Sequence, residues 1–534
     1  MDRIVALLLA CFAIAACSKS DGVQIGTGQD PDPVIIDFPI AYIEAPLPMD
    51  ANGVFEQRDV REQVTFDFGA DLFYRERPAV GAEPVNITGE VTQGRGAIRD
   101  VEIDYDGSRI LFSMRTPFVD GIDEDDQPAT WNIWQYTFET DELVRVIADP
   151  LTAEIGHDIM AKYLPDGRIV FASTRQTQSQ ALLLDENKGA FPAMDEDENE
   201  YAFNLHVMND DGSNIRQVTF NRSHDLDPSV LANGKIVFSR WDHNETNNQI
   251  NLYQMNPDGS GIELLYGQWS HDTGTNGSTI QFLQPRETDD GRIMIVARPF
   301  NNTDGGGELV VIDTPSYVEN AQPLKDNIGV LSGPAQADAT VNEVSTEPGV
   351  SPGGRYYSAF PLQDGTGRVL VSWSQCRLVE RLENDGEAAT EDTRIAPCTA
   401  ENLQNVVAAD PNNPPAPGVG EFTIAPPLYG IWIYDPRDQT QVPIVKGEEG
   451  FMFTEVVSGD PRPFPAVIPD GTDYYTQDPS LPDSGEAVLN IRNVYDIDGV
   501  LSPGIDPYVL ADPAQTLADE RPARFLRIEK AVSI

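Results

Sequence analysis

The chain repeats a hairpin pattern in which an apolar strand, a tight Asp-Gly or Asn-Gly turn and a second apolar strand follow one another. Glycine accepts the positive φ that such turns require, and the alternation of apolar and polar residues fixes one buried face. Each copy therefore predicts a β-hairpin. Five copies are present, the last two more loosely, and they read VEIDYDGSRILFSMR from Val101, AKYLPDGRIVFASTR from Ala161, PSVLANGKIVFSRWD from Pro228, PRETDDGRIMIVARP from Pro285 and GVSPGGRYYSAF from Gly349.

A second hairpin, which opens with a short aromatic strand, alternates with the first. Its six copies begin at Asp71, Asn132, Asn204, Asn251, Glu308 and Gly430. Two hairpins per unit give four antiparallel strands, which is the make-up of one propeller blade. The sequence therefore predicts an all-β fold, a β-propeller of about six four-stranded blades over residues 34–469.

The first of these blades lacks a local inner hairpin. The strand pattern FPIAYIEAPLP from Phe38 and the segment from Phe451 to Val457 are the two candidates to complete it. A ring closed by strands from both ends of the chain has no free sheet edge. Residues 470–534 hold two isolated strand patterns and predict a small C-terminal β extension, in a chain that we expect to be a truncated or degraded form of a longer protein.

The first residues predict export. Arg3 precedes an apolar stretch, residues 4–16, that is too short to cross a bilayer as a helix. The string IAAC that ends at Cys17 resembles the lipobox of bacterial lipoproteins. This resemblance implies a signal peptide over residues 1–16, acylation of Cys17 and a lipid bilayer as a partner. A plain secretory signal with an incidental cysteine is the alternative.

The composition after Cys17 suits an exported protein. Residues 17–33 are rich in Gly, Ser, Asp and Pro and predict a flexible tether, and Ser18 resembles the outer-membrane sorting pattern. We therefore expect an outer-membrane lipoprotein of the cell envelope, facing the periplasm or the cell surface. Cys376 and Cys398 remain in the exported body, and an oxidising compartment favours a disulfide between them.

The charge of the chain excludes some partners. Against 36 basic residues stand 86 acidic ones, a formal charge of -50, so binding of nucleic acid through a basic face is not expected. The acidic runs at residues 195–199 and 120–126 place oxygens as calcium loops do, but they lack the turn glycine and the closing glutamate. We interpret them as solvated acidic loops. Insertions at residues 120–128, 185–201 and 375–420 are expected to form loops on one rim.

Four of the five histidines lie beside an aspartate, and the pairs are His157-Asp158, His224-Asp225, Asp242-His243 and His271-Asp272. Three pairs open an inner hairpin, where propeller residues approach the central channel. Because a carboxylate can orient an imidazole for metal binding, these eight residues are candidates to bind a divalent metal or a ligand. The alternative, which we favour, is structural, since such residues also accept backbone N–H groups that lock adjacent blades. The fifth histidine, His206, is expected to pack in an outer strand.

Three stretches carry a family resemblance, and they read GHDIMAKYLPDGRIVFASTRQ, SHDLDPSVLANGKIVFSRWDH and NLYQMNPDGSGIELLYGQWSH. They resemble the propeller-bearing middle region of the hydrazine synthase alpha subunit and its relatives, and the repeats look like TolB and WD40-like propeller repeats. The resemblance is specific from Gly156 to His271 and weak over the rest of residues 35–530. It implies a propeller and export. Hydrazine synthesis is not implied, because that family binds c-type haem through Cys-x-x-Cys-His motifs, which this sequence lacks.

The leading functional hypothesis is a noncatalytic binding or scaffold module that takes a protein or a small ligand at the propeller rim or channel. The sequence contains no Gly-x-Ser-x-Gly nucleophile elbow. A rival hypothesis is a component of a periplasmic redox system that uses the His-Asp pairs as a metal site or docks a haem partner. A third is a carbohydrate-acting propeller, for which acids and tryptophans must converge on one pocket.

Overall fold

The computed structural model describes residues 38–50, 55–123, 127, 130–185, 187–195, 200–244, 247–382, 393–407 and 420–471. The expected signal peptide over residues 1–16, the tether over residues 17–33 with Cys17, and nearly all of the C-terminal extension lie outside these residues. Among the residues that are described, no helix combines the length and the apolar character needed to span a bilayer.

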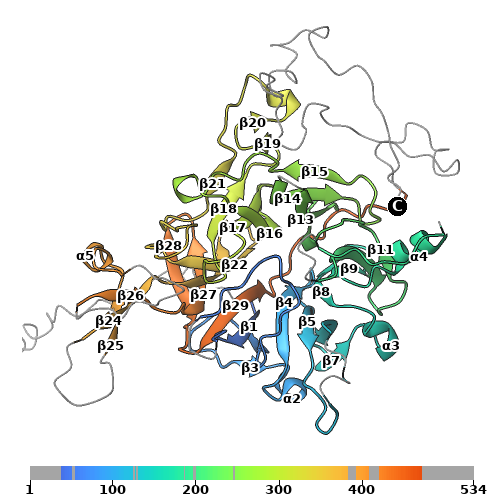
Figure 1. Ribbon diagram of the computed structural model, residues 1–534, viewed down its shortest axis with the longest axis horizontal. Helices are drawn as coiled ribbons and strands as arrows, with labels where there is room; N and C mark the ends of the chain where they lie inside the picture. Colours follow the sequence, from blue (N-terminus) through green and yellow to red (C-terminus); the bar gives the residue numbers. More distant parts are fainter. Residues whose placement is uncertain are drawn as a thin grey trace, which may run out of the picture. The chain divides into compact units, whose positions relative to one another are not determined.

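Six four-stranded antiparallel sheets form the body and are numbered here as blades 1–6, each given from its inner to its outer strand (Figure 1). Blade 1 holds β29 (Phe451–Ser458), β1 (Ile40–Pro46), β2 (Asp71–Arg75) and β3 (Val85–Asn86), and blade 2 holds β4 (Ala97–Ile103), β5 (Arg109–Arg115), β6 (Asn132–Thr137) and β7 (Glu142–Arg145). Blade 3 holds β8 (Asp158–Tyr163), β9 (Arg168–Ser173), β10 (Asn204–Asn209) and β11 (Arg216–Gln217), and blade 4 holds β12 (Asp225–Val230), β13 (Ile236–Asn244), β14 (Asn247–Met255) and β15 (Glu263–Tyr266). Blade 5 holds β16 (Gln281–Glu287), β17 (Ile293–Arg298), β18 (Glu308–Ile312) and β21 (Gln336–Asp338), and blade 6 holds β22 (Arg355–Pro361), β23 (Val369–Ser374), β27 (Tyr429–Asp435) and β28 (Thr440–Val445).

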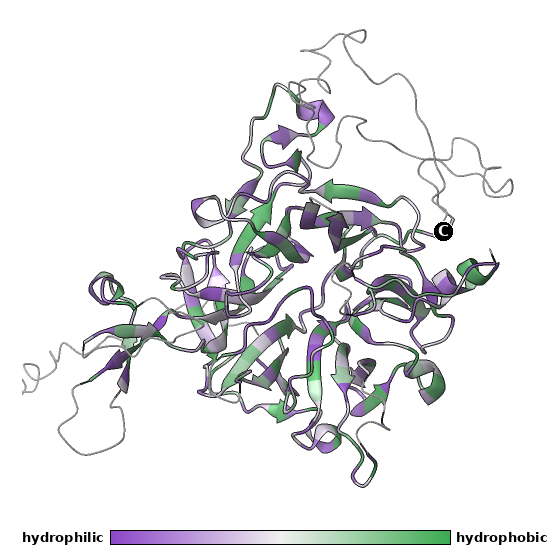
Figure 2. Cartoon of the chain, in the orientation of Figure 1, coloured by the Kyte–Doolittle hydropathy of each residue, from purple (hydrophilic) through white to green (hydrophobic). Residues whose placement is uncertain are grey.

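The six inner strands close a ring. β29 contacts β4, β4 contacts β8, and the series continues through β12, β16 and β22 back to β29. Apolar residues fill the space between neighbouring blades, and Figure 2 shows hydrophobic residues concentrated in the strands. The predicted six-bladed propeller is confirmed.

Closure of the ring is also confirmed as predicted. β1 pairs with β29 in the register Ile40 to Ser458 and Pro46 to Phe451, so strands from opposite ends of the described chain lie side by side in blade 1. This pairing gives β1 and β29 neighbours that neither has locally, and it leaves no inner edge of blade 1 open.

Two of the predicted hairpins are wrong. In the copy from Gly349, RYYSAF is the inner strand β22 itself, and its partner β23 follows a turn over residues 362–368. In the copy from Glu308, the outer partner of β18 is β21, with Ile312 opposite Gln336. The reason is an insertion, because β19 (Tyr317–Glu319) and β20 (Gln322–Pro323) pair with each other in a separate sheet.

The stretch 375–420, expected to be a loop, forms a small sheet of its own. β24 (Arg377–Arg381) pairs with β25 (Thr393–Pro397) and with β26 (Phe422–Ile424), and α5 (Ala400–Leu403) lies between the last two in sequence. The expected disulfide joins Cys376 to Cys398 at the base of this sheet. The remaining short helices are α2 (Gly89–Thr92), α3 (Pro150–Ala153), α4 (Thr177–Asp185), η2 (Thr275–Gly277) and η3 (Lys325–Asn327).

Candidate functional site

A ring of six residues, one from each inner strand, lines the central channel. Each inner strand has a break in its pairing register near its middle, which is the mark of a β-bulge. The bulge residues are Asp100, Met160, Asp227, Gln284, Tyr357 and Glu455, and all six line one cavity. The first four have positive φ values between 50° and 64°, which are uncommon for residues with a side chain. The bulges therefore turn these side chains toward the channel.

Hydrogen bonds connect the ring residues of successive blades. Both oxygens of Glu455 accept backbone N–H groups of blade 2, with Oε1 3.0 Å from the nitrogen of Asp100. Asp100 Oδ2 accepts the N–H of Met160 at 3.1 Å, and Asp227 Oδ2 accepts the N–H of Gln284 at 3.0 Å. A buried N–H without an acceptor costs about 1–3 kcal/mol, so these side chains hold the blades in register.

A segment between β1 and β2, residues 55–68, covers one mouth of the channel, and we name it the plug (Figure 1). It contacts several blades in turn. The N–H of Val60 donates to the carbonyl of Phe300 after β17, Arg99 of β4 donates to the carbonyl of Gln63 at 3.1 Å, and the ring of Phe66 stacks on Trp131 with centroids 5.2 Å apart. Because these partners belong to blades 5 and 2, the plug must cross the channel mouth.

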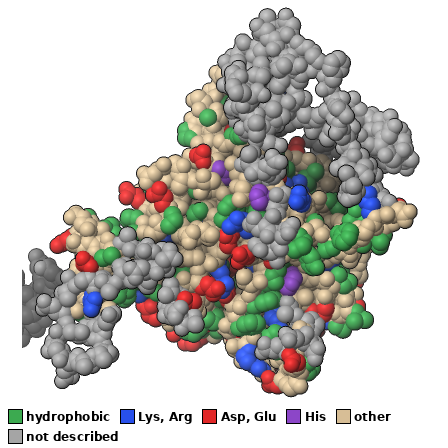
Figure 3. Space-filling view, viewed as in Figure 1, with side chains coloured by type: hydrophobic (Ala, Val, Ile, Leu, Met, Phe, Trp, Pro, Cys, Tyr) green, Lys and Arg blue, Asp and Glu red, His purple; other side chains and the backbone are tan. Residues whose placement is uncertain are grey.

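A cavity of about 140 Å³ lies between the plug and the ring residues. Besides the ring, its lining includes Trp131, the plug residues Arg58, Asp59 and Asp67, and the strand residues Arg99 and Arg298. An apolar cavity of about 150 Å³ accepts a molecule as large as benzene, so this one has room for a small ligand. Figure 3 shows acidic and basic side chains gathered near the middle of this face.

Most charges around the cavity have a partner of opposite sign or a hydrogen-bond donor. Asp59 accepts from Arg61 at 2.9 Å, Arg58 forms an ion pair with Asp67, and Arg99 donates to Asp100 at 3.1 Å. Glu455 lies against backbone N–H groups, and burial, together with the charge of Asp100, raises its pKa to about 7. The carboxylates of Asp59, Asp67 and Glu455 are therefore engaged within the protein.

The opposite mouth holds a different charge group. Glu102 of β4 is 2.9 Å from Lys162 Nζ, 2.6 Å from Arg286 Nη1 and 2.7 Å from Arg462 Nη2. Although burial raises it, the pKa of Glu102 is held well below its usual value by Arg286, Lys162 and Arg462. The three cations come from three separate segments, so this cluster ties blades 2, 3 and 5 to the segment after β29.

That segment, residues 459–471, crosses the opposite mouth. Arg462 donates its N–H to the carbonyl of Tyr105, Ala466 donates to Ala232, and Asp470 pairs with Arg168 at 2.9 Å. A Cβ added to Gly234, which has a φ of +86°, would lie 2.1 Å from the carbonyl oxygen of Ala466. The turn glycine of this inner hairpin therefore serves both the turn and the close approach of the crossing segment.

The structure places the first two His-Asp pairs in matching structural roles. Nδ1 of His157 accepts the N–H of Trp131 at 3.3 Å, and Nδ1 of His224 accepts the N–H of Phe203 at 3.1 Å. Each imidazole thus holds the third strand of the preceding blade. The neighbouring acids form buried ion pairs within their own blades, Asp158 with Arg175 and Asp225 with Arg240. Burial lowers the pKa of His157 to about 4.

The other two pairs lie in blades 4 and 5. His243 stacks on Trp241 with centroids 5.2 Å apart, and Asp242 accepts from Asn251 at 2.8 Å. His271 Nε2 lies 2.8 Å from Asn251 Oδ1, and Asp272 Oδ1 accepts from Thr279 at 3.1 Å. Burial lowers the pKa of His271 to about 4. Within the described residues, these eight side chains do not form one cluster of potential metal ligands.

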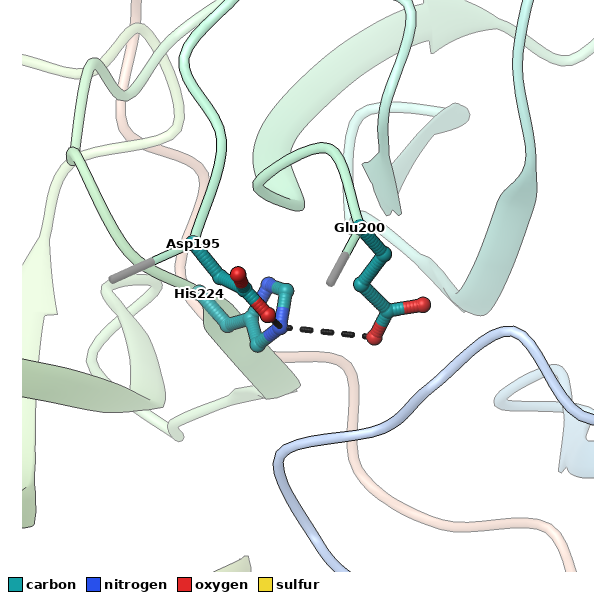
Figure 4. A group of neighbouring side chains, drawn as sticks. All are labelled: Asp195, Glu200 and His224. Carbon is teal, nitrogen blue, oxygen red and sulfur yellow. Dashed lines mark ion pairs between the residues drawn. The ribbon is translucent and has the colours of Figure 1, made fainter. Parts of the chain in front are cut away.

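His224 instead meets two other acidic side chains, Asp195 and Glu200, at the plug (Figure 4). Asp195, Glu200 and His224 each offer a ligand atom, these atoms lie within 4.8 Å of one another, and the group could hold a metal ion. His224 Nε2 is 3.5 Å from Glu200 Oε1 and 3.9 Å from Asp195 Oδ2. The acidic run at residues 195–199 supplies one of these residues, and its residues 196–199 lie outside the described part of the chain.

The hydrogen bonds of this group favour a role as an anchor for the plug. A neutral imidazole donates from one nitrogen and accepts at the other. Because His224 Nδ1 accepts a backbone N–H, Nε2 carries the proton and donates to the carbonyl of Arg61 at 3.0 Å. A ligating histidine instead donates from its second nitrogen. Glu200 accepts from the N–H groups of Gln63 and Val64, the latter at 2.8 Å, so both residues hold plug backbone.

Sequence reasoning missed the ring, the plug, Glu200 and Arg298. A signal for the ring is present in the sequence, since Asp100, Met160, Asp227 and Gln284 each stand directly before one of the repeated inner hairpins. Only Asp100 and Asp227 share a side-chain type, and this variety conceals the periodicity. The plug has no alternating pattern, and the role of Arg298 depends on contacts that only the folded ring defines.

No protein-family model and no curated protein sequence matches the chain. Solved structures do match. Hydrazine synthase from Kuenenia stuttgartiensis matches with a TM-score of 0.50 and 16% identity over 81% of this chain and 48% of that one. TolB from Acinetobacter baumannii matches with a TM-score of 0.34 and 13% identity over 63% and 61%.

The chain spans about half the length of the hydrazine synthase chain. An oligogalacturonate lyase from Vibrio parahaemolyticus matches with a TM-score of 0.31 and 10% identity over 71% of both chains. At 16% identity the similarity to the hydrazine synthase structure shows the fold alone, and it agrees with the ring of six four-stranded sheets as a β-propeller.

Proposed function

We propose that the protein is a noncatalytic binding module whose ligand is a small molecule held in the cavity beneath the plug. One observation carries this proposal. Six residues, one from each blade, and a segment that crosses the channel mouth enclose a single cavity of about 140 Å³. A rigid ring with a covered polar cavity suits selective binding of a small ligand. Catalysis would in addition need a nucleophile or an acid–base pair free to act, whereas these carboxylates are bonded to protein donors.

A cavity-filling variant tests the proposal. Thr65→Phe places an aromatic ring on the plug at the cavity wall. Native protein and the variant are incubated with a small-molecule extract of bacterial cells, separated from free solutes, and their bound molecules are identified by mass spectrometry. We expect a molecule that is retained by the native protein and absent from Thr65→Phe.

Thr137→Phe, at the outer end of β6, serves as the matched control and should retain the molecule. Thermal unfolding verifies that both variants are folded. The same set of bound molecules on the native protein and on Thr65→Phe would contradict a binding site in the cavity.

We also propose that Cys17 is acylated and anchors the propeller to the outer membrane. The string IAAC that ends at Cys17, the following Ser18 and a disulfide between Cys376 and Cys398 support export to an oxidising compartment. Metabolic labelling with palmitate in a bacterial host tests this. Label is expected on the native chain and not on Cys17→Ala, and equal labelling of both would contradict it.

The rival is a component of a periplasmic redox system, and the group Asp195, Glu200 and His224 is the observation that favours it. Elemental analysis of the purified protein discriminates between the two. Stoichiometric metal that is lost in His224→Ala but kept in His243→Ala would support the rival. A metal-free native protein would leave the anchor role of His224 as the explanation of its position.

A further inference from the structure

Arg298 is the cationic side chain of the cavity wall whose charge lacks a close counter-ion. Arg298 stands at the end of β17, opposite Gln281 of β16. Its side chain makes no hydrogen bond and no ion pair within 4.0 Å with the described residues. Its Nη1 atom is buried and has no acceptor. The carboxylates of Asp59 and Asp227 act on it only from beyond ion-pair distance.

A guanidinium nitrogen that is buried without an acceptor is costly. Arginine stays charged in proteins, and an unpaired buried charge costs free energy that a well-packed apolar residue would not. Burial lowers the pKa of Arg298 from its usual value, which reflects this cost. By contrast Arg58 and Arg99 of the same cavity pair with Asp67 and Asp100. Arg298 therefore offers the cavity a donor group that the protein leaves unused.

A second donor lines the same cavity. Tyr357, the ring residue of blade 6, lines the same cavity, and its hydroxyl makes no hydrogen bond with the described part of the chain. Arg298 and the Tyr357 phenol act on each other electrostatically. Burial raises the pKa of Tyr357 to about 12, so its hydroxyl stays protonated and can donate. The guanidinium fork and the phenol O–H together present several donors, while the carboxylates of Asp59 and Asp227 act on Arg298 only from a distance.

We propose that Arg298 and Tyr357 form the recognition site for a compact oxyanion, a group such as a carboxylate or a phosphate, in the cavity beneath the plug. The planar fork of arginine matches two oxygens of such a group at once. The volume of about 140 Å³ matches a small acid. This inference rests on the proposed function and names the chemical class of its ligand.

Thermal unfolding of the full chain at constant ionic strength tests the inference with three probes: inorganic phosphate, acetate and the cation putrescine. Ligand that binds the folded state raises Tm with concentration. We expect phosphate, acetate or both to raise the Tm of the native protein, and the comparison of the two separates an inorganic oxyanion from a carboxylate. Arg298→Met should weaken this affinity about ten- to hundred-fold, and Tyr357→Phe should weaken it less.

Arg292→Met is the matched control, because Arg292 belongs to the same blade and pairs with Asp290 in an exposed position. It should leave the response to the anions unchanged. Arg298→Lys, which keeps the charge but not the fork, should respond between native and Arg298→Met. An anion-dependent rise that survives in Arg298→Met would overturn the inference, as would a native protein that responds to neither anion.

A response to putrescine alone would overturn the oxyanion site and leave the proposed binding function in place. The proposed function is tested separately by the retention experiment. It fails if the native protein and Thr65→Phe retain the same small molecules. The two ideas can therefore fail independently.

Discussion

Two charge groups lie on either side of the ring of bulge residues, and they differ in whether each charge has a partner of opposite sign. On the side of segment 459–471, the carboxylate of Glu102 has three cations within 2.9 Å. On the side of the plug, the guanidinium of Arg298 has no ion pair with the described residues. Glu102 lies on the inner strand β4 and Arg298 on the second strand β17 of the same ring. The difference therefore separates a structural cluster from a group that is available to a ligand.

The two covering segments differ in the same sense. Segment 459–471 is fixed by ion pairs of Arg462 and Asp470. It packs so closely on Gly107 and Gly234 that a Cβ at either position would clash with its backbone. The plug is held by hydrogen bonds to its backbone, from Arg99 and to Glu200 and His224, and by side-chain contacts such as the stack of Phe66 on Trp131, without the cluster of cations around one anion seen at Glu102. Backbone hydrogen bonds at a surface open at low cost compared with a buried ion cluster. We infer that the plug side is the side at which a ligand enters.

The largest loss of stability is expected when Glu102 is substituted. Glu102→Gln leaves Lys162, Arg286 and Arg462 without their shared anion, so the free energy of unfolding should fall by about 3–5 kcal/mol. Urea denaturation measures it. Asp290→Asn, which breaks the exposed pair with Arg292, should cost less than about 1 kcal/mol. Equal effects of the two substitutions would remove the distinction between the charge groups.

The ring residue Glu455 provides a pH-dependent test. Burial raises its pKa from the usual 4.5 to about 7, so the folded state binds its proton more tightly than the unfolded state does. The resulting stabilisation is fully present below about pH 4.5 and is lost as the pH rises through 7. A shift of this size corresponds to about 3 kcal/mol.

Glu455→Gln should remove this part of the pH dependence, measured as urea stability at several values between pH 4.5 and 7.5. The exposed Glu142→Gln is the control and should keep it. Buried histidines change stability in the opposite direction in this range, because burial lowers the pKa of His157 and His271 to about 4. The comparison between variants is therefore decisive, and parallel pH curves for native protein and Glu455→Gln would contradict the raised pKa.

A smaller loss of stability, confined to the plug, is expected when Glu200 is substituted. Glu200→Ala removes the acceptor of the Gln63 and Val64 N–H groups. The free energy needed to open the plug locally should fall by about 1–3 kcal/mol. Hydrogen exchange should speed up in residues 60–66 and stay slow in β4 and β29. Exchange that rises throughout the ring would show that the plug and the blades open together, and it would contradict the separate plug.

The sequence predicted the ring because its signals are local. Turn glycines such as Gly107 and Gly167 and the alternation around them define each inner hairpin without reference to distant residues. The closure by β1 and β29 was also predictable, since blade 1 lacked a local inner hairpin and the strand patterns from Phe38 and Phe451 flank the other hairpins in the sequence. The hairpin from Gly349 was wrong because Pro352-Gly353-Gly354 has the composition of a turn but precedes the strand pair.

The site was less predictable because it depends on tertiary contacts. The His-Asp pairs stood out by composition, yet His157 and His224 serve to hold backbone N–H groups of neighbouring strands. Asp195 lay in a run interpreted as a solvated loop, and the structure buries it beside His224. No local pattern distinguishes Arg298 from Arg286. Arg298 has no ion pair within the described residues, whereas Arg286 pairs with Glu102.

The sign of the stability change at Arg298 tests the central comparison most directly. In a buffer that lacks small oxyanions, Arg298→Met removes a half-buried charge that has no ion pair with the described residues, and it keeps an apolar stem of similar length. Urea unfolding should show that this variant is as stable as the native protein or more stable, whereas Glu102→Gln under the same conditions is clearly less stable. A loss in Arg298→Met as large as that in Glu102→Gln would mean that Arg298 is a structural partner like the others, and the oxyanion site would have no basis.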